Sequence, residues 1–184
     1  MITDYETLIK RLFPLAEKIS YDQIIAGDII ARGGVGIYGE VKEAIIISIV
    51  HHKDEEDNWQ ADKNSFTTEV ATKSLEAEGQ WYYRLRKAEN SEGFNVSSVK
   101  YIHDIIEASN LTSEIAFEEL QVGDIIAVGD LYEKDGDYMP EIYIAKLHHL
   151  DNENWWCIDE EESFRPTGER TYDISEWLYK ISLK

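Results

Sequence analysis

Two pairs of adjacent histidines are the residues in this sequence that are best placed to do chemistry. His51-His52 and His148-His149 each stand directly before an acidic segment. Imidazole nitrogens and carboxylate oxygens are common ligands of zinc and other divalent metals, so the pairs support one hypothesis, a small-ligand or metal-binding module. Neighbouring residues of a strand face opposite sides, however, so each pair offers only one outward imidazole. Without cysteine ligands or helically spaced histidines nearby, we predict that the protein holds no metal and no cofactor.

Two further segments imitate known binding loops but lack the geometry that those loops need. Residues 34–39 match G-x-G-x-x-G, yet a β-branched run follows them where a dinucleotide fingerprint requires a helix. Residues 151–162 approach a calcium loop, but Trp156 occupies the position that requires glycine for the tight turn.

Cys157 lies beside two tryptophans, as a packed thiol would. No combination of Ser, His and Asp stands in a catalytic context, so we predict a protein that is not an enzyme and has no catalytic residues.

The charge balance is the most informative property of the composition. The 184 residues include 37 Asp and Glu against 18 Lys and Arg, a formal net charge of −19 at pH 7. Such a balance argues against direct binding to nucleic-acid phosphates, which requires a basic face. An acidic surface can simply promote solubility, or it can steer the protein into a basic groove of a partner, with tryptophans as anchors. Acidic segments that also carry tryptophan favour the second interpretation.

We therefore expect two acidic loops to form a partner-binding surface. One loop follows His52 and the other follows His149, and the second contains two adjacent tryptophans. The expected contact residues are Asp54, Glu55, Glu56, Asp57, Asp151, Glu153, Trp155, Trp156, Asp159, Glu160, Glu161 and Glu162.

An internal repeat organises the elements that must position these loops. Residues 5–31 align with residues 101–127 at an offset of 96, and both blocks contain the sequence Gly-Asp-Ile-Ile-Ala. The histidine pairs and the acidic residues after them align at an offset of 97, and the offset returns to 96 at a tryptophan near the end of each half. Three matching blocks in the same order indicate two homologous units. We place these units at residues 1–92 and 97–184.

Each unit is expected to contain one helix followed by several short strands. Apolar residues at helical spacing predict a helix over residues 4–19, which Pro14 kinks or divides, and another over residues 98–108. An Asp-Gly pair at residues 135–136 predicts a hairpin turn. Apolar, β-branched or aromatic runs predict strands that begin at Ile29 and Ile125 and that cover 41–52, 141–150, 81–85 and 177–181.

The resulting fold class is α+β, with two tandem homologous units. In each unit an N-terminal helix precedes a small bent antiparallel sheet or an SH3-like barrel. The Gly-Asp-Ile-Ile segment that follows a loop, at residues 27–30 and 123–126, resembles the opening of many SH3-like barrels. The second unit is the more acidic of the two.

Several features indicate a cytoplasmic protein. The single cysteine excludes an intramolecular disulfide and fits a reducing compartment. Residues 1–6 lack the basic region and the apolar run of a signal peptide. The longest apolar run, Ala44–Val50, is too short to span a bilayer, so we expect no membrane contact. The expected setting is a bacterial or phage-infected host cell.

In composition, size and lack of catalytic motifs, the chain resembles the acidic inhibitors with which bacterial viruses block restriction or CRISPR nucleases. It is similar in the same respects to bacterial immunity proteins, so an immunity-type inhibitor of a toxin is an alternative. The resemblance implies a non-enzymatic DNA mimic whose carboxylates stand in for phosphates. Its partner would be a protein with a basic surface, a nuclease or another nucleic-acid-binding protein, without direct contact to nucleic acid. A homodimer could present duplicated surfaces, and an enzyme site between the units is the least supported alternative.

Overall fold

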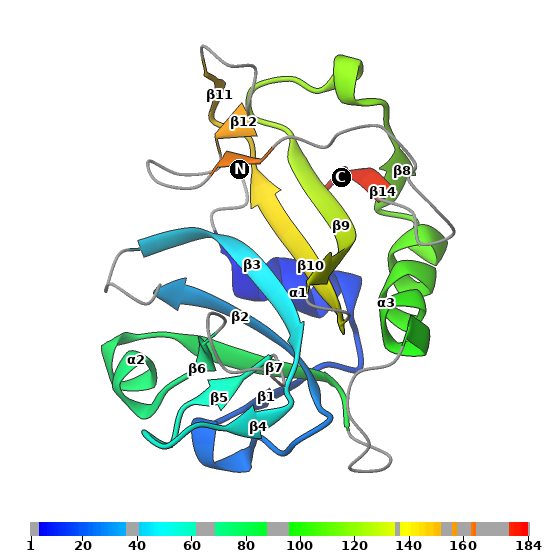
Figure 1. Cartoon of the computed structure of the whole chain (residues 1–184). Helices are drawn as coiled ribbons and strands as arrows, with labels where there is room; N and C mark the ends of the chain where they lie inside the picture. Colours follow the sequence, from blue (N-terminus) through cyan, green and yellow to red (C-terminus); the bar gives the residue numbers. More distant parts are fainter. Residues whose placement is uncertain are drawn as a thin grey trace. The chain divides into compact units, whose positions relative to one another are not determined.

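The structure is a computed structural model that describes residues 4–35, 41–61, 69–87, 96–134, 137–151, 156–157, 163–164 and 177–183. This part of the chain combines helices with antiparallel strands and consists mostly of strands (Figure 1). The predicted mixture of helix and antiparallel sheet is therefore confirmed. The chain divides into two compact units, Met1–Tyr101 and Ile102–Lys184, each of which is described by itself.

The first helix, α1 (Tyr5–Leu12), is shorter than the sequence predicts. Asp4 caps its N-terminus, because the Asp4 carboxylate accepts a hydrogen bond from the N–H of Glu6 at 3.0 Å. The prediction of one helix over residues 4–19 is wrong in its second half. Pro14 cannot donate the next helical hydrogen bond and disfavours helical backbone at the residue before it, so the helix ends there.

In the described part of unit 1, four strands pair antiparallel in the order β1-β7-β2-β3. Their bounds are β1 Glu17–Ile19, β2 Ile29–Val35, β3 Val41–Ile49 and β7 Trp81–Arg86. Helix α1 lies against one face of this sheet, where the hydroxyl of Tyr83 donates a hydrogen bond to the carboxylate of Glu6 at 2.7 Å. The strands predicted for this unit are present, although β3 ends before the histidine pair.

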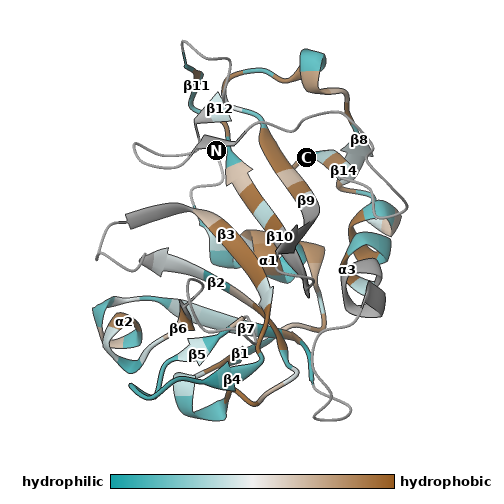
Figure 2. Ribbon diagram, viewed as in Figure 1, coloured by the Kyte–Doolittle hydropathy of each residue, from teal (hydrophilic) through white to brown (hydrophobic). Residues whose placement is uncertain are grey.

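The other face of these strands is covered by a small three-stranded sheet. Its strands follow the order β4-β5-β6, with bounds β4 His52–Lys53, β5 Trp59–Gln60 and β6 Glu69–Ala71. A hydrophobic core joins the two layers, and its buried residues are Ile19, Tyr21, Ile24, Ile30, Val50, Trp59, Val70, Ala71 and Tyr82. Tyr82 belongs to this core while its neighbour Tyr83 faces α1, so β7 is buried on both faces. Figure 2 shows the contrast between the brown middle of β3 and the teal surface strand β4.

The sequence interpretation missed helix α2 (Lys73–Glu78), which lies between β6 and β7 in the chain. The sequence features that begin and end this helix are local. The hydroxyl of Thr72 accepts a hydrogen bond from the N–H of Leu75 at 3.0 Å, and Gly79 ends the helix with a φ of +114°. Threonine is a common N-cap residue and glycine a common residue at the C-terminal end of a helix. A helix of 6 residues with one buried side chain is nevertheless too short to show a periodic apolar face in the sequence.

Unit 2 also has four antiparallel strands, in the order β8-β14-β9-β10. The bounds of its elements are α3 Val96–Ala108, whose second half belongs to this unit, β8 Thr112–Glu114, β9 Ile125–Lys134, β10 Asp137–Lys146 and β14 Trp177–Ile181. A small sheet has the order β11-β12-β13, with bounds β11 His149–Leu150, β12 Trp156–Cys157 and β13 Ser163–Phe164. Lys134 pairs with Asp137, which confirms the predicted hairpin, whose turn residues 135–136 lie outside the described part.

In each unit a glycine lies beneath the tryptophan with which it pairs on the neighbouring strand. Gly33 of β2 pairs with Trp81 of β7, and a Cβ atom on this glycine would lie 2.4 Å from Cζ2 of the indole. Gly129 of β9 pairs with Trp177 of β14, and a Cβ atom there would lie 2.0 Å from Cε2. The absent side chain therefore provides the space in which each indole covers the neighbouring strand.

A Gly-Asp turn opens the first long strand of unit 1. Gly27 has a φ of +91°, which favours glycine, and its N–H donates a hydrogen bond to the carbonyl of Val50 at 2.7 Å. The carboxylate of Asp28 is buried, and one oxygen accepts from the N–H of Ile25 at 3.2 Å and from Nε of Arg84 at 2.9 Å. The turn thus joins the start of β2 to the end of β3 and to β7.

The same turn opens β9 in unit 2. Gly123 also has a φ of +91°, and its N–H donates to the carbonyl of Leu147 at 2.7 Å. The carboxylate of Asp124 accepts from the N–H of Gln121 at 3.0 Å and pairs with Nζ of Lys180 at 2.7 Å. The two ion pairs differ in burial. Their side-chain exposures are 0% for Asp28 and 12% for Arg84, against 11% for Asp124 and 35% for Lys180.

Replacing Asp28 by Asn should destabilise the protein much more than replacing Asp124 by Asn. The first change removes the buried carboxylate that faces the nearly buried guanidinium of Arg84, at a cost of about 3 kcal/mol in the free energy of unfolding. The second breaks a more exposed pair and should cost about 1 kcal/mol or less. Urea unfolding followed by circular dichroism measures both values. Equal losses in the two variants would show that burial of the ion pair does not control its contribution.

Candidate functional site

The acidic segment of unit 1 forms the turn between β4 and β5. The carboxylate of Asp54 accepts hydrogen bonds from the N–H groups of Glu56 at 2.9 Å and Asn58 at 2.8 Å, and from the side-chain amide of Gln60 at 2.7 Å. These bonds, that from the Asn58 N–H above all, hold the pKa of Asp54 below its ordinary value. Asp54 therefore directs its charge into the turn and holds the turn together.

Asp57 is also bound within the turn. It adopts a φ of +66°, and its carboxylate lies 2.7 Å from Nζ of Lys53 and 3.8 Å from Nζ of Lys73. The hydrogen bond from Lys53 lowers the pKa of Asp57, and the same bond raises the pKa of Lys53. The ammonium group of Lys53 also lies over the rings of Tyr21 and Trp59, 4.8 and 5.1 Å from their centroids.

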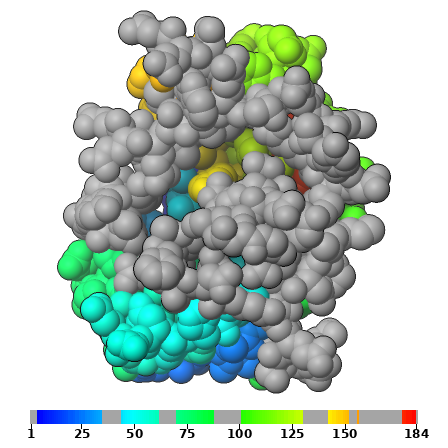
Figure 3. Space-filling model, viewed as in Figure 1, coloured from blue at the N-terminus to red at the C-terminus, as the bar shows by residue number. Residues whose placement is uncertain are grey.

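The two remaining acidic residues of this turn, Glu55 and Glu56, have exposed side chains. They stand between the two residues that fix the turn, Asp54 and Asp57. Figure 3 shows this segment, in cyan, at the surface of unit 1. Of the four carboxylates predicted to bind a partner here, two hold local structure and two are presented to solvent.

Most of the acidic segment predicted in unit 2 lies outside the described residues. This applies to Glu153, Trp155, Asp159, Glu160, Glu161 and Glu162. Asp151 is half-buried directly after β11. Trp156 is 6% exposed on β12, much as Trp59 is 8% exposed on β5, so both indoles are buried, and Trp59 belongs to the hydrophobic core of unit 1. Of the two adjacent tryptophans, only Trp155 is left as a candidate for an exposed anchor.

The histidine pairs occupy corresponding places in the two small sheets. His52 lies on β4 opposite Gln60, and His149 lies on β11 opposite Cys157. The backbone N–H of His51 donates to the carbonyl of Gln60 at 2.8 Å. Among the residues that the structure describes, neither pair is gathered with further His, Cys, Asp or Glu side chains into a group of three that could hold an ion.

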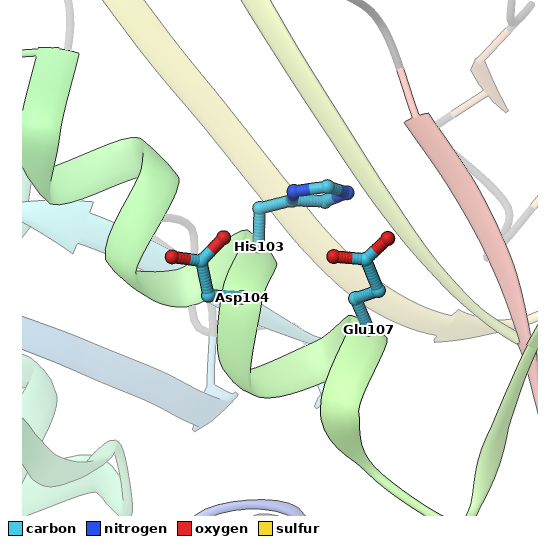
Figure 4. A group of neighbouring side chains, drawn as sticks. All are labelled: His103, Asp104 and Glu107. Carbon is cyan, nitrogen blue, oxygen red and sulfur yellow. The ribbon is translucent and has the colours of Figure 1, made fainter.

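Such a group lies elsewhere, on helix α3, and the sequence interpretation missed it. His103, Asp104 and Glu107 offer ligand atoms that all lie within 4.8 Å of one another (Figure 4). The spacing explains the arrangement, because residues three and four apart on a helix are neighbours on its surface. The available signal was the pattern H-D-x-x-E within a predicted helix.

Aromatic residues of β14 hold the imidazole of His103 in place. Its Nε2 lies 3.2 Å from the hydroxyl oxygen of Tyr179. The ring centroid of His103 is 5.3 Å from that of Trp177 and 5.8 Å from that of Tyr179. Burial raises the pKa of Tyr179, and the charges of Glu107 and Glu114 raise it further, so its hydroxyl stays protonated at neutral pH.

The corresponding place in unit 1 carries a different set of charges. At an offset of 96 the residues that match His103, Asp104, Glu107 and Glu114 are Thr7, Leu8, Arg11 and Lys18. The tyrosine is kept, but the hydroxyl of Tyr83 donates to Glu6, which also pairs with Nζ of Lys18 at 2.7 Å. The two units therefore share the aromatic residues and differ in the polar groups next to them.

Comparisons with protein-family models, with curated proteins and with solved structures found no match to this chain. Within the part of the chain that the structure describes, no helix combines the length and the apolar character needed to cross a membrane.

The bonds of Asp54 predict that the stability of unit 1 depends on pH. Because the pKa of Asp54 is lower in the folded state than in the unfolded state, ionised Asp54 stabilises the fold above its unfolded pKa, which is about 3.9 for a free side chain. This contribution is lost as the pH falls through the folded pKa. Replacing Asp54 by Ala should therefore cost about 1 kcal/mol at pH 7, the scale of a net hydrogen bond, and progressively less as the pH falls below about 3.9.

The free energies of unfolding of the two proteins, measured by urea titration between pH 7 and pH 2.5, check this prediction. Replacing the exposed Glu56 by Ala in the same turn is the matched control and should leave the free energy of unfolding nearly unchanged. A difference between wild type and the Asp54 variant that does not shrink at low pH would contradict the assignment.

Proposed function

We propose that this protein is a non-enzymatic acidic binding protein that inhibits or regulates a nucleic-acid-handling partner. Its carboxylates would occupy a basic groove in place of phosphates, as in phage-type anti-restriction and anti-CRISPR inhibitors. The observation that carries the proposal is the turn between β4 and β5. There Asp54 and Asp57 are bound locally and present Glu55 and Glu56 to solvent on a fixed backbone. A fixed backbone supports binding, because less conformational entropy is lost when the partner docks.

The charge of the whole chain supports the same proposal. Residues 1–96 carry 17 acidic and 11 basic residues, and residues 97–184 carry 20 acidic and 7 basic residues. An excess of this size creates a long-range negative field that accelerates association with a basic surface and disfavours acidic partners. The partner class is therefore a nuclease or another nucleic-acid-binding protein, and a nuclease toxin neutralised by an immunity-type inhibitor falls within it.

We further infer that the two units are tandem homologous copies of a helix followed by an SH3-like barrel. Three features support this inference: the equal order of the four main strands, the glycine beneath a tryptophan, and the Gly-Asp turn with its basic partner. In unit 1 the core between the two sheets supports a strongly bent sheet. Duplicated units offer two versions of each loop, and unit 2 carries the larger negative charge.

Removing charges from the acidic loops should slow association with the partner without affecting folding. Two variants test this: Glu55→Gln with Glu56→Gln in unit 1, and Glu160→Gln with Glu161→Gln and Glu162→Gln in unit 2. Each exposed charge pair contributes about 0–1 kcal/mol, so we expect a several-fold slower association for each variant and a weaker dependence on salt. The second variant removes more charge from the more acidic unit and should have the larger effect.

Surface plasmon resonance against a panel of restriction and CRISPR nucleases, at salt concentrations from low to about 1 M, measures these rates. The matched control is Glu78→Gln, an exposed carboxylate on α2 away from the turn, which should change the association rate little. Binding that persists unchanged at about 1 M salt, where the screening length is near 3 Å, would exclude phosphate mimicry. Binding that depends on Glu78 as strongly as on Glu55 and Glu56 would exclude a specific role for the turn.

A further inference from the structure

We propose that His103, Asp104 and Glu107 of helix α3 form a binding site for a divalent transition-metal ion, with zinc as the best match. The proposal does not rest on the proposed function, and it departs from the prediction, made from the histidine pairs in the sequence, that the protein holds no metal. The three side chains supply one imidazole nitrogen and two carboxylates from a single helix, with their ligand atoms within 4.8 Å of one another (Figure 4). Around a tetrahedral zinc ion with bonds of about 2.1 Å, ligand atoms lie about 3.4 Å apart. Small rotations of these side chains would therefore close the site.

The contact with Tyr179 prepares the imidazole for this role. A metal-bound histidine almost always donates the N–H of its other ring nitrogen to a neighbouring acceptor, which fixes the tautomer and the ring orientation. Nε2 of His103 lies 3.2 Å from the hydroxyl oxygen of Tyr179, which can accept that bond. Nδ1 is then left as the nitrogen that carries a lone pair for the ion. The rings of Trp177 and Tyr179 restrict the imidazole further.

The surrounding charge favours a cation at this place. Glu114 of β8 is the direct pairing partner of Tyr179, and the charges of both Glu107 and Glu114 act on the tyrosine hydroxyl. The site therefore brings several carboxylates close to a single imidazole. A divalent ion would be attracted by the negative charge of these carboxylates. In unit 1 the matching residues Arg11 and Lys18 would repel such an ion. We therefore expect no metal to bind at the corresponding place in unit 1.

The mixture of ligands selects the class of metal. Imidazole suits zinc, nickel and other late transition metals, whereas calcium and magnesium prefer oxygen ligands alone. Thiolate, which selects copper(I), is absent from the three side chains. Three protein ligands leave one tetrahedral position for water. Zinc is therefore the probe with which to test the site.

The test is isothermal titration calorimetry of the untagged full chain with zinc chloride, after treatment with a chelator. We expect about one zinc ion per chain, and an increase in the melting temperature when zinc is present, because the ion binds the folded state. His103→Ala, Asp104→Asn and Glu107→Gln should each weaken zinc binding by at least about tenfold. Circular dichroism of each variant establishes that it folds, and the two isosteric carboxylate variants keep the test decisive if His103→Ala does not fold.

Two control variants separate this site from adventitious binding. His148→Ala with His149→Ala removes the histidine pair of unit 2, and Glu118→Gln with Glu119→Gln removes exposed carboxylates of the same unit. Both should bind zinc as the wild type does, whereas magnesium should not compete with zinc. Zinc binding that is unchanged by Glu107→Gln and Asp104→Asn, or that is lost with the histidine pair, would overturn the proposal. Failure to bind zinc at 1 mM would overturn it as well.

Discussion

The buried carboxylate of Asp28 is the constraint on which the architecture of unit 1 depends. A carboxylate removed from water costs several kcal/mol unless it is paired and hydrogen-bonded, so its partners must be in place for the unit to fold. Those partners are the N–H of Ile25, in the loop before β2, and the guanidinium of Arg84, on β7. Arg84 in turn reaches Glu17 of β1. One buried charge therefore sets the relative positions of β1, β2 and β7.

The glycine before this carboxylate completes the junction. In both units the glycine N–H donates to a carbonyl at the end of the second long strand, a geometry that requires the positive φ of the glycine. The chain must leave that strand at this point, and it continues directly into the histidine pair and the small sheet. The Gly-Asp junction thus fixes the point at which the chain enters the small sheet, and the acidic turn between β4 and β5 follows from there.

Much of this arrangement could be predicted from the sequence, because it is encoded in local patterns that occur twice. The Gly-Asp-Ile-Ile segments marked the start of a strand, and the Asp-Gly pair marked the β9–β10 hairpin. The second half of the first predicted helix was wrong because apolar periodicity at Leu15 and Ile19 outweighed the effect of Pro14 in our interpretation. Leu15 is 94% exposed, and Ile19 is buried as part of a strand.

The candidate sites could be predicted less well, for a physical reason. The role of a carboxylate depends on the donors that the fold brings to it, and the run Asp-Glu-Glu-Asp does not show that its first and last members are bound by Asn58 and Lys53. In the same way, the pattern H-D-x-x-E does not show that His103 meets Tyr179, which lies 76 positions later in the chain. Alternation and helical spacing report which face a residue occupies, but not which distant side chain lies opposite.

The comparison of the two units separates residues that hold the fold from residues that are free to specialise. The Gly-Asp turn, its basic partner on the last strand and the glycine beneath a tryptophan recur in both units. Beside the shared tyrosine, by contrast, Arg11 and Lys18 in unit 1 correspond to Glu107 and Glu114 in unit 2. The sign of the charge therefore changes at two aligned positions while the aromatic residue is kept. Function in this chain is best sought where the units differ.

The burial of Trp59 and Trp156 also defines what kind of binding the acidic loops can support. Aromatic anchors provide most of the affinity at protein interfaces, whereas exposed charges mainly provide rate and selectivity. Since both indoles are buried, the described residues of the small sheets offer charge without an exposed tryptophan. Association through the turn at Glu55 and Glu56 would therefore be fast and sensitive to salt. Slow dissociation would require an apolar contact, from Trp155 or from an exposed apolar residue such as Val122 at 65% exposure.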